Sequence, residues 1–147
     1  MARAPRLAEP EEDEDLPVRA NPELFGHDAA AAALEGAALS GRLAHAWLVT
    51  GPPGIGKATL GYRFARWLLA GAPPTPAGAT GLRLAPDQPA FRRVLANGHA
   101  DFRALRPVAE GRVNKEIRVD AVRAAIRFLG MTPAEGGWRV VLVDTAE

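Results

Sequence analysis

A glycine-rich stretch between Thr50 and Leu60 (TGPPGIGKATL) constrains this chain more than any other feature of its sequence. It matches the phosphate-binding pattern G-x-x-x-x-G-K-[ST] as far as the lysine, with Gly51, Gly56 and Lys57 at the fixed positions. In such a loop, backbone N–H groups surround the phosphates and the lysine reaches the terminal ones. The predicted nucleotide-binding residues are Gly51, Pro52, Gly54, Ile55, Gly56, Lys57, Ala58 and Thr59.

The residue after the lysine departs from the pattern. Ala58 stands where a hydroxyl normally binds Mg²⁺, and a methyl group cannot coordinate a cation that requires oxygen ligands. Thr59 follows one residue later, about 100° further around a helix, so we expect it to touch an inner phosphate rather than a metal. The loop predicts ATP or a similar nucleotide as its ligand, with Mg²⁺ only where a nucleotide is bound. A glycine-rich turn without a ligand stays open as the alternative.

The residues around the loop follow the strand, loop, helix order that the motif requires. Ala46–Thr50 (AWLVT) is a short apolar run and predicts the strand, and Lys57–Ala70 predicts the helix. Arg63 and Arg66 are expected to point away from the apolar face of that helix. This face, expected to pack on a sheet, repeats at four-residue steps and consists of Leu60, Phe64 and Leu68.

Length and composition set the outer bounds. The chain has 147 residues, 48% of them apolar, which suits one domain with its own core. It contains no cysteine, which excludes disulfides, thiolate zinc sites and catalytic thiols. His27, His45 and His99 lack metal-ligand spacing, and we predict no metal site. No apolar run has the length of a membrane span or the pattern of a signal peptide, so we expect a cytoplasmic protein.

Acidic residues are concentrated at the N-terminus. Residues 1–20 contain six acidic residues, three arginines and three prolines, a composition that predicts a disordered acidic leader. Residues 21–147 are then the folded body. With 18 − 3 = 15 basic and 17 − 6 = 11 acidic residues, this body is mildly basic.

Beyond the loop, the sequence predicts alternating helices and strands. The predicted helices are His27–Ser40, Ala90–Ala96 and one that begins at Asp120 as its N-cap. The predicted strands are Asp101–Leu105 and Trp138–Asp144, the latter buried on both faces. An irregular proline-rich segment, Gly71–Pro89, and a polar turn, Gly111–Lys115, lie between them. This order predicts an α/β fold with a mostly parallel sheet flanked by helices, and a ligand site at the carboxyl ends of the strands.

The helix after Asp120 combines apolar and basic positions. Arg123 and Arg127 lie four residues apart and therefore share one side of the helix. Beside them, the predicted buried stripe consists of Val122, Ile126 and Leu129.

Asp144 ends the last predicted strand, where the second nucleotide motif of a phosphate-binding fold is expected. There it would orient water around Mg²⁺, and the alternative is an ordinary aspartate that caps the next turn. In ATPases of the AAA+ group a glutamate follows this aspartate, whereas here Thr145 follows, and Glu147 comes three positions after Asp144. We therefore assign no catalytic residue and expect negligible ATP hydrolysis.

Five segments together resemble a known family. They are PELFGH (22–27), GRLAHAWLVTGPPGIGKATLGYRFARWLL (41–69), GHADF (98–102), IRVDAVR (117–123) and FLGMTPAEGGWRVVLVD (128–144). Their order resembles the delta prime subunits of the bacterial DNA polymerase III clamp loader, in the alphaproteobacterial form. The resemblance spans residues 21–147 and is far more specific than the phosphate-binding loop alone.

The resemblance implies a P-loop NTPase core of the AAA+ type, expected to be truncated after the Walker B strand, with the lid and collar domains outside this chain. It implies a non-hydrolysing subunit that helps load the sliding clamp onto primed DNA during replication. The implied partners are the motor subunits and the clamp-opening subunit, with the clamp contacted indirectly. Within an assembled ring, the resemblance implies that Arg118, Arg123 and Arg127 can face DNA phosphates; a solvated arginine face stays open as the alternative. Many relatives carry a four-cysteine zinc module after the loop-bearing helix; here Gly71–Pro89 takes its place, so no zinc is implied.

Two other classes of function stay open on the residues alone. The glycine-rich loop by itself fits an active P-loop ATPase or a P-loop kinase, although Ala58 argues against both. The second of these classes is a regulatory nucleotide sensor that is unrelated to replication.

Overall fold

The structure is a computed structural model of the chain, and it describes residues 17–79, 81–109 and 115–144. Its helices are α1 (Asp28–Leu39), α2 (Lys57–Leu69), α3 (Pro89–Leu95) and α4 (Val119–Leu129). Its strands are β1 (Phe102–Leu105), β2 (Val108–Ala109), β3 (Lys115–Glu116) and β4 (Val140–Val143). The helices predicted from the sequence agree with these bounds to within one or two residues. The predicted polar turn lies mostly outside the described residues, as do residues 1–16 of the predicted leader.

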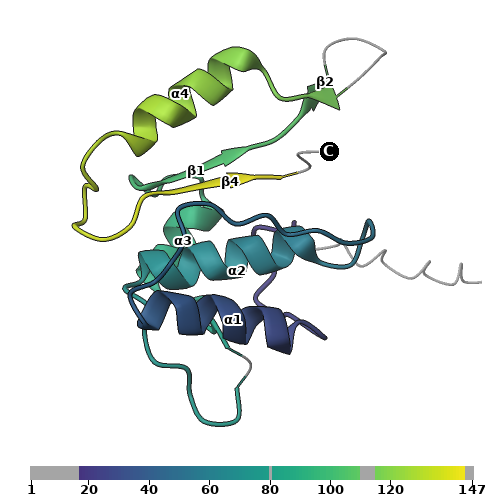
Figure 1. The fold of residues 1–147 in the computed structure, drawn as a ribbon, viewed down its shortest axis with the longest axis vertical. Coiled ribbons are helices and arrows are strands. Elements are labelled where there is room, and N and C mark those ends of the chain that lie inside the picture. The colour runs from purple at the N-terminus through teal and green to yellow at the C-terminus, as the bar shows by residue number, and fades with distance from the viewer. Residues whose placement is uncertain (1–16, 80, 110–114, 145–147) are drawn as a thin grey trace, which may run out of the picture.

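The centre of the fold is a parallel pair of strands between two layers of helices. β1 pairs with β4 in parallel, with Phe102 opposite Val140 and Leu105 opposite Val143. α4 covers one face of this pair, while α2, α3 and α1 lie on the other side (Figure 1). β2 and β3 form a separate antiparallel pair. The α/β class and the parallel pairing are therefore confirmed, but in the described residues the parallel sheet has only two strands.

The strand predicted at Ala46–Thr50 is wrong for this structure, which has no regular element there. Leu48 is 83% exposed, and Trp47 and Val49 are also exposed. A parallel strand is held by a hydrogen-bonded neighbour, and an apolar run does not reveal whether one is available. β4 was also predicted to be buried on both faces, yet its residues are half-buried and Val143 is exposed.

The buried core gathers around α2. Trp67 is fully buried, and its indole Nε1 donates to the Pro73 carbonyl at 2.8 Å, which fixes the start of the proline-rich segment. One apolar cluster joins α2 to α1 and to Leu82. A second cluster joins the other side of α2 to α3 and β1 through Tyr62, Ala65, Val94 and Phe102. Because α2 contributes residues to both clusters, it is the central helix of the described fold.

Two arginines of α2 contradict the prediction that they point away from the core. Arg63 and Arg66 are both buried, with Arg66 only 1% exposed. The Arg63 guanidinium donates to the carbonyls of Pro22 and Gly81, at 2.7 and 3.0 Å. Burial lowers the pKa of Arg66 to about 10. The segment before α1 lies against this face of the helix, and its backbone carbonyls accept hydrogen bonds that make the burial of charge tolerable.

α4 also differs from its prediction in the side that it buries. Ala125 and Phe128 are the buried residues, because they face the sheet, and Phe128 packs under the guanidinium groups of Arg103 and Arg139. The predicted stripe is exposed instead: Val122, Ile126 and Leu129. The apolar arc of this helix is wide, so its periodicity alone could not identify the sector that meets the sheet. The N-cap is Arg118 rather than Asp120, which lies in the first turn.

Glycines on two helices offer a matched test of packing. A Cβ on Gly61 of α2 would lie 2.6 Å from Leu142 Cδ1, whereas a Cβ on Gly36 of α1 would meet nothing within 4 Å. We expect Gly36→Ala to raise the free energy of unfolding by about 0.5 to 1 kcal/mol, since alanine favours helix. The free energy of unfolding of Gly61→Ala should be about 1 to 3 kcal/mol lower than that of Gly36→Ala, because Leu142 must move.

Denaturant unfolding of both variants measures this difference. In a Leu142→Ala background the obstruction is gone, so Gly61→Ala should no longer destabilise the protein. Equal effects of the two substitutions in the wild-type background would contradict close packing of α2 on β4.

Candidate nucleotide site

The glycine-rich loop has the backbone that its sequence predicts. Gly51, Gly54 and Gly56 have φ angles of 149°, 75° and 97°, a region in which a side chain is strained. Gly56 is the left-handed N-cap of α2, so the loop leads directly into the N-terminus of this helix. That end carries a partial positive charge and N–H groups without helical partners, which together attract an anion.

Lys57 and the two residues after it open the helix. The Lys57 ammonium donates to the Gly51 carbonyl and, at 3.4 Å, to the Pro52 carbonyl, so it folds back over the loop. Ala58 and Thr59 are half-buried in the first turn of α2. The loop therefore places a fixed cation beside exposed backbone, which suits the binding of phosphate.

His27 supports the loop in a way that the sequence analysis did not predict. Its Nε2 lies 2.6 Å from the Ile55 carbonyl, across 28 residues of sequence. A Cβ on Gly56 would lie 3.3 Å from this nitrogen, so the absence of a side chain there lets the imidazole approach. In the sequence, His27 stands directly before a predicted helix, and this position does not reveal its distant partner.

Asp144 lies at the carboxyl end of β4, as predicted, and a cation lies beside it. Its backbone N–H donates to the Leu105 carbonyl at 2.9 Å, which continues the pairing of β4 with β1. Arg106, the residue after β1, places Nε 3.9 Å from Asp144 Oδ2. The same guanidinium donates from Nη2 to the Tyr62 hydroxyl at 2.6 Å and lies over the Tyr62 ring. Sequence reasoning missed Arg106, although its position directly after a strand was a usable signal.

The glycine-rich loop and Asp144 lie at the same end of the molecule. Figure 1 shows the N-terminus of α2 and the carboxyl ends of β1 and β4 at one end of the fold. Tyr62, on the second turn of α2, links this helix to Arg106 and through it to Asp144. The predicted site residues from the two motifs are thus carried by adjacent elements.

These residues do not fit a magnesium ion. Mg²⁺ in a phosphate-binding loop is held by the hydroxyl after the lysine and by the second-motif aspartate. Ala58 offers no oxygen, and the carboxylate of Asp144 faces a guanidinium. Within the described part of the chain, no group of three or more His, Asp or Glu side chains could hold a metal ion.

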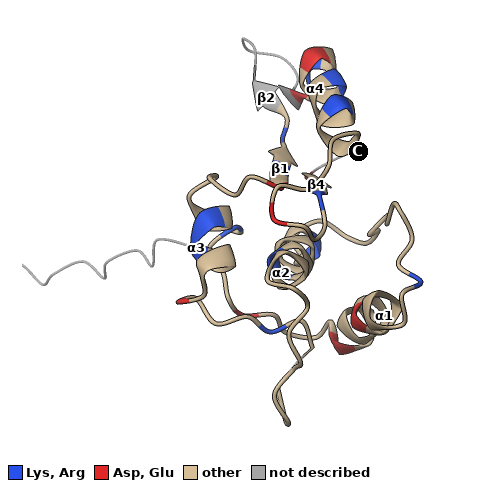
Figure 2. Cartoon of the chain, turned by 90° about the vertical axis from the view of Figure 1, so that its left-hand side faces the viewer, with Lys and Arg blue, Asp and Glu red and all other residues tan. Residues whose placement is uncertain are grey.

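The three arginines that were predicted to contact DNA lie on and beside α4. Arg118 is the N-cap and pairs with Asp120 at 3.2 Å, while Arg123 and Arg127 are exposed. Figure 2 shows the basic residues of α4 on the layer of the fold opposite α1 and α3. They share the exposed surface of the helix with Val119 and Ile126. Their contact with DNA stays a prediction.

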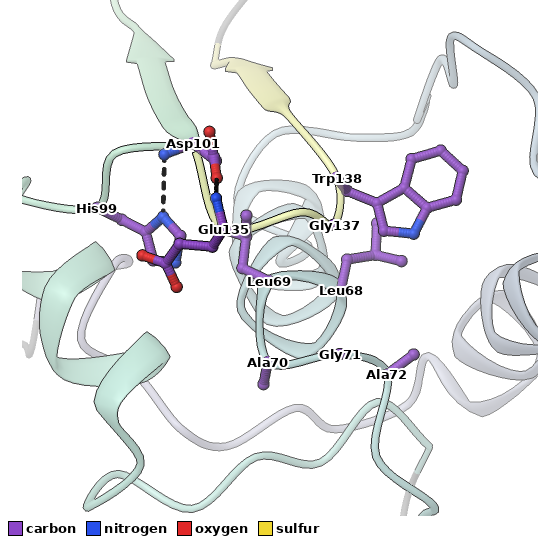
Figure 3. A pocket seen from close by; sticks show the side chains of 10 residues that line it. All are labelled: Leu68, Leu69, Ala70, Gly71, Ala72, His99, Asp101, Glu135, Gly137 and Trp138. Atoms are coloured by element: carbon purple, nitrogen blue, oxygen red, sulfur yellow. Dashed lines mark hydrogen bonds between the residues drawn. The ribbon is translucent and has the colours of Figure 1, made fainter. Parts of the chain in front are cut away.

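A pocket of about 390 Å³ lies at the other end of α2 (Figure 3). Asp101, 1% exposed, accepts hydrogen bonds from the N–H groups of Ala134 and Glu135 and pairs with Arg139. His99 lines the same pocket and accepts the Asp101 N–H through Nδ1 at 3.1 Å. This contact places the ring proton on Nε2, which is buried and has no hydrogen-bond partner among the described residues. The two residues form a polar cluster that fixes the loop before β4.

Burial lowers the pKa of His99, and this makes stability depend on pH. A depressed histidine pKa means that the unfolded chain binds the proton more readily, so stability is complete above about pH 6.5 and is lost as pH falls below it. We expect the free energy of unfolding to fall by no more than about 1.4 kcal/mol per pH unit there. His99→Asn should flatten this slope, because Asn can still accept the Asp101 N–H but does not titrate.

Chemical unfolding between pH 7.5 and 5.5 tests the expectation. The matched control is His45→Asn, the same substitution at an exposed histidine. An unchanged slope in His99→Asn would show that another group is responsible.

Comparisons with known proteins show what this chain is similar to. A family model described as DNA polymerase III, delta subunit, matches residues 26–147. DNA polymerase III subunit delta' of Pseudomonas aeruginosa is 40% identical to this chain over 104 residues, which cover 71% of the chain and 29% of that relative. No solved structure gives a significant match.

None of the described helices is both long enough and apolar enough to cross a membrane.

The family model covers most of the chain, and the similarity to subunit delta' covers 71% of it. The chain therefore belongs to the family of delta-prime-type subunits of the DNA polymerase III clamp loader.

Proposed function

We propose that this chain acts as a non-hydrolysing subunit of the replicative clamp loader and helps to load the sliding clamp onto primed DNA. Its membership of the delta-prime family supports the assignment to replication. The observation that carries the rest is that an intact lysine loop occurs together with Ala58 and with an Asp144 whose carboxylate lies 3.9 Å from the Arg106 guanidinium. Such a site keeps the groups that bind phosphate and lacks those that activate its cleavage.

Several finer features belong to this proposal. The described α/β core is the N-terminal part of an AAA+ domain, and the protein works in the cytoplasm. Its partners are the motor subunits and the clamp-opening subunit, and it meets primed DNA through the assembled ring. The exposed arginines of α4 would contact the DNA backbone without reading its sequence, because guanidinium groups pair with phosphates.

Association is the direct test. The protein, tagged at its native locus, should co-purify with the motor and clamp-opening subunits in amounts comparable to its own. A matched purification from cells that carry the same tag on an unrelated cytoplasmic protein controls for adventitious binding. Recovery of the tagged protein without either subunit would overturn the assignment to the clamp loader.

Hydrolysis and binding separate the proposal from an active ATPase. We expect no ATP hydrolysis above background with Mg²⁺, and Ala58→Ser alone should not restore it, since a water-polarising acid is also missing. Lys57→Ala should weaken ATP binding by about 10- to 100-fold, the worth of a charge-assisted hydrogen bond. Calorimetric titration measures the binding. Turnover that is lost in Lys57→Ala would instead support the ATPase.

A further inference from the structure

We propose that the Arg106 guanidinium replaces the divalent cation at Asp144, so that this site binds a nucleoside triphosphate without a metal ion. The inference rests on the proposed function only in using the same phosphate-binding loop. It goes beyond the loss of ATP hydrolysis, because it names the cation that the site uses and the form of ligand that it accepts.

Arg106 has an exposed side chain that is anchored to a buried residue. Its Nη2 donates to the hydroxyl of Tyr62 at 2.6 Å, and its guanidinium carbon lies 5.5 Å from the centre of that ring. Tyr62 is 1% exposed and belongs to a core cluster with Phe102. A buried tyrosine on α2 therefore holds the guanidinium in place between the helix and the carboxyl end of the sheet.

The charge of Arg106 is directed at the second-motif carboxylate. Its Nε lies 3.9 Å from Asp144 Oδ2, a distance at which the two opposite charges attract each other. A divalent cation bound to Asp144 would lie close to this guanidinium, and the two positive charges would repel. Since Ala58 supplies no second oxygen, both changes disfavour the metal for independent reasons.

The guanidinium is also suited to the ligand. Its side chain is 41% exposed, and a guanidinium carries five N–H donors, one of which, on Nη2, donates to Tyr62. Arginine pairs with phosphate through directed hydrogen bonds and stays charged at any physiological pH. Lys57 supplies the other cation from the loop. Together they oppose the negative charge of a triphosphate that carries no Mg²⁺.

Titration of the chain with ATP in EDTA and in Mg²⁺ tests the proposal. The wild type should bind ATP in EDTA at least as tightly as in Mg²⁺. Arg106→Gln should weaken the binding in EDTA by about 10-fold or more, the worth of a charge-assisted contact. Arg92→Gln, the same change at an exposed position on α3, should leave it unchanged. Tyr62→Phe keeps the ring but removes the hydroxyl anchor, and should give a smaller loss than Arg106→Gln.

A metal readout makes the test independent of affinity. With Mn²⁺ and ATP, electron paramagnetic resonance should show no protein-bound Mn²⁺ in the wild type, and it should show bound Mn²⁺ in the double variant Ala58→Ser/Arg106→Gln. Thermal midpoints of all variants confirm that they fold. The proposal is overturned if the wild type needs Mg²⁺ to bind ATP, binds no ATP in either buffer, or loses nothing in Arg106→Gln. Each of these results leaves co-purification with the clamp loader unaffected, so the two proposals fail separately.

Discussion

Replacing Arg66 with alanine is expected to lower the free energy of unfolding by about 4 kcal/mol, a large share of the stability of a small domain. The Arg66 guanidinium donates to the carbonyls of Arg19 and Asn21, at 2.6 and 2.9 Å, and lies 4.1 Å from the centre of the Phe91 ring. Removing it leaves two carbonyls without their donor and opens a space beside Phe91. Both changes occur where water has little access, since Arg66 is 1% exposed.

Two further substitutions separate the causes. Arg66→Met retains much of the volume and the packing on Phe91 but removes the donors, so we expect it to destabilise less than alanine does. Arg92→Ala, at an exposed arginine of α3, should change stability by no more than about 0.5 kcal/mol. Denaturant unfolding of the three variants gives the comparison. If Arg66→Ala and Arg92→Ala lower the free energy of unfolding by the same amount, Arg66 does not hold the segment before α1 against α2.

Replacing Asp101 with asparagine is expected to lower the thermal midpoint by on the order of 10 °C. Its carboxylate accepts two backbone N–H groups, from Ala134 at 2.8 Å and Glu135 at 3.0 Å, and lies 3.4 Å from Arg139. Asparagine has one acceptor oxygen, so its amide N–H₂ would face either a backbone donor or the guanidinium. The loop that leads into β4 would lose its anchor, and the pairing of β4 with β1 depends on that loop.

The same carboxylate predicts a pH dependence with a definite sign. The hydrogen bond from Ala134, followed by that from Glu135 and the charge of Arg139, lowers the pKa of Asp101 below its usual value of 3.8. Its stabilisation is therefore complete above about pH 4 and is lost as pH falls through the lowered value. Thermal unfolding from pH 7 to pH 3 should show this acid loss in the wild type and a weaker one in Asp101→Asn. Asp87→Asn, at an exposed carboxylate, is the control; if it matches Asp101→Asn, the loop has another anchor.

The local features of the candidate site were predictable because they depend on short stretches of chain. The glycines of the loop, the start of α2 at Lys57 and the position of Asp144 at a strand end all follow from residue type and spacing. Positive φ angles select glycine, and helical periodicity selects the bounds of a helix. The loss of the hydroxyl at Ala58 is likewise visible in one residue of the sequence.

The tertiary structure decided which side of each helix meets the core. Arg66 is buried because backbone carbonyls more than forty residues away accept its hydrogen bonds, and no local pattern reveals such partners. On α4 the sheet meets Ala125 and Phe128 rather than the predicted stripe, since an arc of apolar residues fits more than one orientation. The segment Ala46–Thr50 has the composition of a strand but forms none, because a strand requires a neighbour.

The sequence by itself thus determined the family, the α/β class and a glycine-rich loop that matches the phosphate-binding pattern except for its metal hydroxyl. Only the tertiary structure brought Arg106 beside Asp144 and His27 against Ile55, pairs separated by 38 and 28 residues. The physical reason is the same in both cases. Charge pairing and hydrogen bonding act over a few ångströms in space, and the folding of the chain sets which distant residues come within that range.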